Sequence, residues 1–509
     1  MNLPTLLLVL PAVGFLIALL LPRSSPHASR TWALVISLAT FAVSLALPAM
    51  FDRNTAGEQL ALNVPWITTP DIHYYVAVDG IGLWLVLLST FLTPICVLIS
   101  WRSIQNRAKE FYAFLLLLEV GLIGVFIAQD LFLFYVFWEI SLVPMYFLVG
   151  IWGHERRIYA AVKFFLFTMA GSVLMLAAII YLYNRAGTFS YPALVEMLQS
   201  GRLAFAPNEQ LLLFLAFFLA FAIKVPLFPL HTWLPDAHVE APTAGSVMLA
   251  SVMLKMGTYG ILHFCLPLFP SASRTCAPWI VVLALIGIIY GALVSLVQPN
   301  MKKLAAYSSV SHLGFVVLGI FSFTQLGFDG AVYQMLNHGI STGALFALVG
   351  LLYERRHSLE IADYGGVATA APWLSTAFLI TTLASIGLPA LNNFVGEFLV
   401  LQGAALANFK WAIYAAIGVI LSACYMLWLY QRVFYGEVNE EIRSHLPDLN
   451  LREWALVVPL IAMMVWMGVY SQSFLPAVGK TTARVLSQTQ VNVPFQVQAR
   501  PQTEVARAR

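Results

Sequence analysis

The sequence predicts an all-α polytopic membrane protein with about 14 transmembrane helices. Of its 509 residues, 60% are hydrophobic and only 10% are charged. A soluble protein carries about 25% charged residues, so this chain cannot cover a water-facing surface. Apolar stretches near 20 residues, the length that crosses a bilayer core, recur along the chain. The net charge of +3 gives no indication of nucleic-acid binding.

The predicted spans begin at the N-terminus. Its stretch MNLPTLLLVLPAVGFLIALLLP has no basic leading segment and no small-residue cleavage motif, so we expect a retained helix rather than a signal peptide. Fourteen spans are expected in chain order, at residues 3–22, 31–50, 78–101, 111–128, 131–151, 160–183, 210–230, 243–266, 278–297, 303–323, 327–353, 374–406, 411–435 and 452–473.

The Lys and Arg residues of the connecting loops predict the orientation. They divide fifteen to five between the two sides of the membrane, leaving aside the tail after residue 476. Cytoplasmic loops carry the excess of positive charge. We therefore expect a multi-pass protein of the bacterial inner membrane with both termini in the periplasm.

Two of the predicted spans are interrupted by proline. The first break lies in AIKVPLFP around Pro226, and the second lies in SIGLPALNN around Pro389. Proline removes a backbone donor and frees a carbonyl, which at membrane depth is tolerated where protein or water satisfies it. The span 374–406 is long enough to form two half-helices.

The order of the spans indicates an internal repeat within one membrane domain, residues 1–509. Spans four to eight and spans nine to thirteen form two groups of five, each with its broken helix in fourth place. Because five is odd, the second group enters the membrane inverted, a recurrent transporter design. The expected segments are 1–110 with the first three helices, 111–266 and 278–435 with the two repeats, 452–473 with the last helix, and 477–509 as a polar tail.

Several titratable side chains fall at membrane depth, where an ionised group costs about 2.5–3.5 kcal/mol on the lenient insertion scale. Such groups must be paired, hydrated or neutral, so their proton occupancy follows their surroundings. A lysine with a mobile carboxylate partner is a two-state proton site, and histidine suits a relay because its unperturbed pKa is near 6.5. The candidates for proton translocation are Glu139, Lys224, Lys255, His312, His338 and Glu397, with Glu119 as a further member.

Each candidate also has a purely structural interpretation. Glu139 could be a static ion-pair partner, Lys255 a fixed counter-ion, and the histidines buried hydrogen-bond donors. The segment HTWLPDAHVEAP, with His231, Asp236, His238 and Glu240, is predicted to be a loop at the membrane edge. It is either a site of proton uptake, at His231 and His238, or a solvated turn.

The sequence gives no indication of a metal or cofactor in this chain. The cysteines Cys96, Cys265, Cys276 and Cys424 are scattered without a C-x-x-C pair, which argues against an iron–sulfur cluster, a zinc site or a disulfide framework. No HExxH-type spacing, dinucleotide G-x-G-x-x-G motif or P-loop is present.

Four stretches together resemble one family. They are DLFLFYVFWEISLVPMYFLVGIWG (130–153), AFAIKVPLFPLHTWLPDAHVEAPTAGSVMLASVMLKMGTYGIL (220–262), KKLAAYSSVSHLGFV (302–316) and GLPALNNFVGEF (387–398). They resemble the antiporter-like membrane subunits of proton-pumping NADH:quinone oxidoreductase, respiratory complex I. The resemblance covers at least residues 78–470 and implies fourteen helices with two inverted five-helix units.

The resemblance also implies a proton channel and a role for each residue. Glu139 and Lys224 match the carboxylate–lysine pair, while Lys255, His312 and His338 match the central polar axis. Glu397 matches the last titratable group before the exit. A glutamate there, where L-type and N-type chains usually carry lysine, is typical of M-type chains.

The partners implied are the other membrane-arm subunits, including the L-type and N-type chains, within the lipid bilayer. The resemblance implies that NAD, FMN, iron–sulfur clusters and quinone are bound by partner subunits. This chain would then act within a proton-translocating enzyme without a redox site of its own.

Three functions compete at this stage. The first is proton transfer from cytoplasm to periplasm, driven by quinone reduction elsewhere in complex I. The second is a subunit of a multi-chain cation/proton antiporter or of a membrane-bound hydrogenase, which use the same module. The third is a membrane scaffold that conducts no ions.

Overall fold

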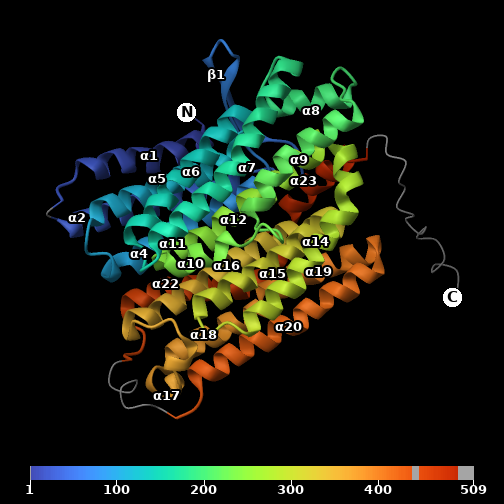
Figure 1. Cartoon of the computed structure of the whole chain (residues 1–509). Helices are drawn as coiled ribbons and strands as arrows, with labels where there is room; N and C mark the ends of the chain where they lie inside the picture. The colour runs from blue at the N-terminus through green and yellow to red at the C-terminus, as the bar shows by residue number, and fades with distance from the viewer. Residues whose placement is uncertain (1, 24, 438–445, 491–509) are drawn as a thin grey trace.

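The predicted fold class is confirmed by a computed structural model, which describes residues 2–23, 25–437 and 446–490. In this part of the chain, 13 helical segments are long and apolar enough to cross a membrane (Figure 1). They are α1 (Leu3–Leu20), α2 with α3 (Pro26–Ser44, Leu47–Met50), α4 (Gly82–Ser103), α5 (Ala108–Ile127), α6 (Leu131–Trp152), α7 (Arg157–Ala186), α9 (Pro207–Lys224), α11 to α13 (Thr243–Leu268), α14 (Pro270–Leu296), α15 (Met301–Phe321), α16 (Gln325–Arg356), α20 (Phe409–Phe434) and α22 (Leu451–Val469).

The one predicted span not among these 13 segments is 374–406, which was expected to form two half-helices. It consists of α18 (Pro372–Ser385) and α19 (Asn392–Ala407), each too short to cross the bilayer alone. The other interrupted span ends as α9 at Lys224 and resumes as the short helix α10 (Trp233–Glu240). Both breaks therefore lie at the predicted prolines.

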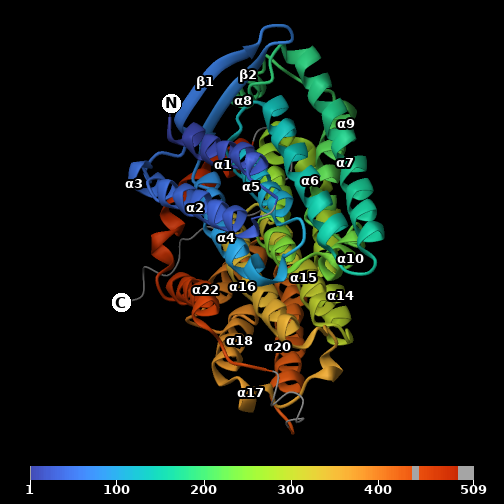
Figure 2. The same cartoon turned by 90° about the vertical axis from the view of Figure 1, so that its left-hand side faces the viewer.

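A matching pair of backbone contacts marks the repeat. In the first unit, Asp130 and Ser190 form an isolated antiparallel bridge, and in the second unit Asn300 and Glu360 form another. Asp130 caps the start of α6 and Asn300 caps the start of α15 through their side-chain oxygens. The first bridge leads into α8 (Tyr191–Gln199) and the second into the turn Ile361–Asp363 and α17 (Val367–Ala370). Figure 2 places α8 and α17 at opposite ends of the molecule, as two inverted units require.

A hairpin that the sequence analysis did not predict covers the end where α8 lies. Its strands β1 (Gln59–Ile67) and β2 (Ile72–Val78) pair antiparallel and project beyond the helices (Figure 2). Part of the expected polar tail 477–509 is helical, since Leu475–Gln488 forms α23 after the short turn Ser471–Ser473. Apolar residues at helical spacing, including Val478 and Val485, bury one face of α23. Residues 491–509 of that tail lie outside the described residues.

The most buried helices stand in the centre of the bundle. The apolar windows of α16 and of Thr243–Leu268 are fully buried and that of α15 is nearly so, whereas about a third of α1, α20 and α22 is buried. Two π-helical turns, Leu249–Met253 and Ile261–Cys265, interrupt the central span on either side of α12 (Leu254–Gly260). Such turns are frequently found at functional sites. The predicted polar residues Lys255, His312 and His338 are all carried by these central helices.

Candidate functional site: a buried polar axis

The first helix break is held by protein groups. Pro226 has no N–H to give to the carbonyl of Ala222, which instead accepts from the N–H of Leu227 at 2.8 Å. The carbonyl of Ile223 accepts a bond of 2.9 Å from the indole Nε1 of the buried Trp233 on α10. The freed carbonyls next to Lys224 are thus satisfied within the protein, and Trp233 ties the two halves of the broken helix together.

Lys224 ends α9 with its side chain fully buried. Its ammonium nitrogen lies 5.4 Å from the ring centre of Trp138 and 5.2 Å from that of Phe164, and it has no hydrogen-bond partner among the described residues. Glu139 is partly buried on α6, and its Oε1 is likewise without a partner in the described chain. Lys224 and Glu139 therefore form no ion pair within the described chain, and aromatic rings lie beside the lysine ammonium.

Lys255 and His338 are in direct contact across two central helices. The Nζ of Lys255 lies 2.6 Å from Nδ1 of His338 on α16 and donates a second bond of 2.6 Å to the carbonyl of Ala250. Ala250 belongs to the π-helical turn before α12. Both Lys255 and His338 are fully buried. Nε2 of His338 has no partner within the described residues and is available for a further proton contact.

His312 and Glu397 form the next contact. Nδ1 of His312 on α15 lies 2.9 Å from Oε1 of Glu397 on α19, and both side chains are almost completely buried. The amide of Gln334 donates a 3.0 Å bond to the same carboxylate oxygen. The rings of His312 and His338 have their centres 5.7 Å apart. The contacts between Lys255, His338, His312 and Glu397 thus form one buried row. The helices that carry these residues, α12, α16, α15 and α19, are labelled in Figure 1.

The second helix break makes room for the Glu397 carboxylate. Gly387 has a φ of 76°, a left-handed conformation that favours glycine. A Cβ at this position would lie 3.2 Å from Oε2 of Glu397. Asn392 and Asn393 attach the break to α16, through bonds of 3.0 Å to the carbonyl of Asn337 and 3.2 Å to the hydroxyl of Ser341. The break is therefore fixed against the helix that carries His338.

The expected loop at residues 231–242 is wrong as a structural prediction, because residues 233–240 form the helix α10. This helix follows the break, and its side chains Trp233, Leu234 and His238 are buried. His231 and His238 are buried rather than solvated. Asp236 forms an ion pair of 2.7 Å with Lys163 of α7.

Sequence reasoning missed three polar features. Lys302 was counted as a loop cation, but it is buried and donates a 2.7 Å bond to the carbonyl of Ala241, which joins α15 to the end of α10. Gln334 stands one helical turn before His338, and that i, i+4 spacing could have revealed it.

The third missed feature is a separate pair at the hairpin end. Asp79 and His263 lie 3.1 Å apart, both nearly fully buried, and Asp79 also caps the start of α4. Glu119, the further candidate, is fully buried on α5 and makes no hydrogen bond within the described residues. No group of three metal-ligating side chains occurs in the part of the chain that the structure describes.

Comparisons with known proteins agree with this arrangement. The sequence profile of the NADH:quinone oxidoreductase/Mrp antiporter transmembrane family matches residues 128–423. NADH-quinone oxidoreductase subunit M of Rhodobacter capsulatus is 45% identical over 510 residues, covering 98% of this chain and 99% of the relative. The chain belongs to the NADH:quinone oxidoreductase/Mrp antiporter family.

Solved structures extend the comparison to the fold. A chain of respiratory complex I from Thermus thermophilus matches with a TM-score of 0.86 and 33% identity, covering 95% of this chain and 99% of that one. A chain of the Mrp complex from Dietzia matches with a TM-score of 0.81 at 20% identity, covering 96% and 100%, which shows the shared fold alone. The family profile extends from just before α6 into α20. It includes all six candidates for proton translocation, from Glu139 to Glu397.

Proposed function

We propose that this chain is the M-type antiporter-like subunit of a bacterial respiratory complex I and moves protons from the cytoplasm to the periplasm. The observation that carries the proposal is the buried row Lys255–His338–His312–Glu397, in which neighbouring titratable groups touch or nearly touch. The relative named subunit M from Rhodobacter capsulatus covers 98% of the chain. NAD, FMN, iron–sulfur clusters and quinone would belong to partner subunits, among them L-type and N-type chains.

The row supports stepwise proton transfer. A proton on the ammonium of Lys255 passes to Nδ1 of His338, which leaves a neutral amine and an imidazolium. The imidazolium then releases the proton on Nε2 towards His312. No hydrogen bond joins the two rings within the described residues, so this step requires a ring rotation or a water molecule. His312 passes a proton from Nδ1 to the Glu397 carboxylate, which releases it towards the periplasm.

Lys224 and Glu139 would control when a proton enters the row Lys255–His338–His312–Glu397. An ammonium held only by aromatic rings is weakly stabilised, whereas an approaching carboxylate favours its charged form. Movement of the Glu139 carboxylate towards and away from Lys224 would therefore alternate between proton uptake and release. Quinone reduction elsewhere in the assembly would drive this alternation, with uptake through the region of His231 and His238.

The test is replacement of Glu397 by glutamine in the assembled complex. Glutamine keeps the size and the hydrogen bond with Gln334 but cannot carry a proton. We expect NADH-driven proton uptake into inverted membrane vesicles to fall by about tenfold or more, in line with the loss of a proton-transfer group. Glu196→Gln, at an exposed glutamate of α8, is the control and should pump normally. Normal pumping by an assembled Glu397→Gln complex would favour the non-conducting scaffold instead.

A second candidate function is a subunit of a cation/proton antiporter or a related membrane-bound respiratory complex. The match to the Mrp fold favours it, since that fold is shared across its length. Isolation of the native assembly separates the two. Co-purification with flavin-containing, NADH-oxidising subunits supports complex I, and their absence supports the antiporter.

A further inference from the structure

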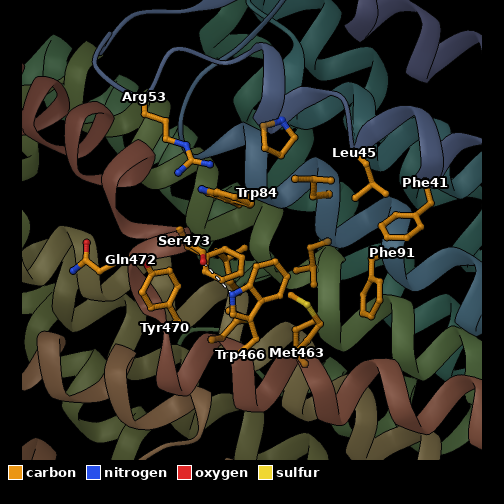
Figure 3. A pocket seen from close by; sticks show the side chains of 17 residues that line it. Phe41, Leu45, Arg53, Trp84, Phe91, Met463, Trp466, Tyr470, Gln472 and Ser473 are labelled. Atoms are coloured by element: carbon orange, nitrogen blue, oxygen red, sulfur yellow. Dashed lines mark hydrogen bonds between the residues drawn. The ribbon is translucent and has the colours of Figure 1, made fainter.

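An apolar cavity of about 390 Å³ lies at the edge of the bundle, away from the polar axis. It is formed by α2, α4, α16 and α22, and its size is that of a small-molecule site. Figure 3 shows its walls of aromatic and aliphatic side chains, among them Phe41, Phe91, Met463 and Trp466. The rim of the cavity carries three apolar side chains that are at least half exposed, Leu45, Trp466 and Tyr470. The cavity therefore opens on an apolar face of the protein.

One end of this cavity is polar, and two donors there, Arg53 and the indole of Trp84, have no acceptor among the described residues. Trp84 is 8% exposed, and its indole Nε1 has no hydrogen-bond partner among the described residues. Buried polar groups without partners are rare in native proteins, and each calls for an explanation. Arg53 lines the same end, and Figure 3 shows its guanidinium reaching towards the nitrogen edge of the Trp84 indole.

The carboxylates near Arg53 are already engaged. The side chain of Asp52 accepts bonds from the N–H of Asn54 and the hydroxyl of Thr55. Glu58 forms an ion pair of 2.7 Å with Arg484. Two donors, one of them a permanent cation, therefore converge on the mouth of an apolar cavity without an anion from the described chain.

We propose that this cavity binds an anionic phospholipid, with the phosphate at Arg53 and Trp84 and an acyl chain along the apolar walls. A phospholipid supplies an anion and a hydrocarbon chain in one molecule, in the order in which the cavity presents its donors and its apolar surface. A transmembrane helix of a neighbouring subunit would also fill the apolar part of the cavity. To neutralise Arg53, however, that helix would need an acidic residue at membrane depth, which is costly. Because Arg53 follows α3 at one end of the bundle, the lipid would belong to the leaflet on the hairpin side.

Photocrosslinking tests the proposal on the intact membrane assembly. The assembly is placed in nanodiscs of phosphatidylcholine with a small fraction of phosphatidylglycerol that carries a photoreactive acyl chain. We expect crosslinks in the segments 41–53, 84–91 and 463–474. Arg53→Gln should reduce them about tenfold and Trp84→Phe, which keeps the ring but loses the N–H, about fivefold, as expected for one charged and one neutral hydrogen bond. Arg102→Gln, at the other end of α4, is the matched control and should leave them unchanged.

Two results would overturn the proposal. One is crosslinking in these segments that is equal in the wild type, Arg53→Gln and Trp84→Phe. The other is cryo-electron microscopy density in which a helix of another subunit occupies the cavity. The proton-pumping rate does not enter this test, so its outcome is independent of the proposed translocation. Should Arg53→Gln prevent assembly, the Trp84→Phe variant retains the packing and decides the question alone.

Discussion

The ammonium of Lys255 lies 2.6 Å from Nδ1 of His338, although 83 residues separate them in the chain. A lysine and a histidine in direct contact inside a bundle cannot both carry a positive charge without a large electrostatic cost. The contact therefore accommodates at most one of the two positive charges. This contact joins the first five-helix unit, which contains α12, to the second, which contains α16.

Lys255→Met should interrupt the row at this contact. Methionine matches the length and apolar stem of the lysine without a proton, so packing in the fully buried site is preserved. We expect assembled complex with proton translocation reduced about tenfold or more, as for loss of a proton-transfer group. Vesicle proton-uptake assays with assembly checked by native gel measure this. Lys480→Met, outside the row on α23, provides the control, and equal pumping in both variants would contradict a relay through Lys255.

Gly387→Ala should impair function beyond its effect on stability. Alanine at this position would have to adopt a φ of 76°. Its Cβ would also lie 3.2 Å from Oε2 of Glu397. Gly187→Ala is a closely matched control, since Gly187 has a φ of 75° but no atom within 4 Å of an added Cβ. Each variant should lose about 1–2 kcal/mol from the left-handed conformation. Thermal denaturation should shift similarly in both, while only Gly387→Ala should slow proton uptake. If Gly187→Ala slowed it equally, strain rather than Glu397 placement would be responsible.

Trp233→Phe should loosen the break beside Lys224. The substitution removes the Nε1 donor and leaves the carbonyl of Ile223 unsatisfied in a buried position, at a cost of about 1–3 kcal/mol. We expect a lower melting temperature and faster hydrogen exchange in α9 near residues 220–225, measured by mass spectrometry. Trp373→Phe, at an exposed tryptophan of α18, should change neither quantity. Unchanged exchange in α9 would show that the indole does not hold the break.

His154 predicts a specific dependence of stability on pH. Burial, and secondarily the nearby charge of Lys302, lower the pKa of His154 from its usual 6.5 to about 4. Between these values the unfolded chain binds a proton that the folded chain does not, so stability falls as pH decreases from 6.5 to 4. His154→Gln removes this contribution. The difference in melting temperature between pH 7 and pH 5 should be smaller in the variant, and an equal difference would rule out His154 as the source.

The sequence predicted the helices well because apolar length and proline position act locally. The breaks at Pro226 and Pro389 follow from backbone chemistry that any single segment carries. The hairpin of β1 and β2 was missed because residues 51–77 lie between the predicted spans and were taken only as a connection. The alternating positions Leu60, Leu62, Val64 and Trp66 are a strand pattern that could have predicted β1. The helix α10 was taken for a loop because Pro235 and the three titratable residues Asp236, His238 and Glu240 conceal its apolar face.

The site could be predicted only as a set of residues. Charge at membrane depth singled out Lys255, His338 and Glu397, but which of them touch depends on how helices from the two units pack. The Asp79–His263 pair was missed because Asp79 lies just before the start of α4, where a carboxylate is expected to be a cap. The contacts of Lys224 with the rings of Trp138 and Phe164 likewise depend on helix packing, which no sequence spacing specifies.

The π-helical turn Leu249–Met253 determines the direction in which the following residues point. Each residue of a regular helix advances the azimuth by about 100°, as 3.6 residues per turn require. The wider turn accommodates an additional residue, so the helix beyond it is rotated relative to an uninterrupted one. Shortening this turn by a single residue would rotate the Lys255 amine by about 100°, away from the imidazole of His338. The direction of the Lys255 side chain therefore depends on the backbone that precedes it as well as on its own rotamer.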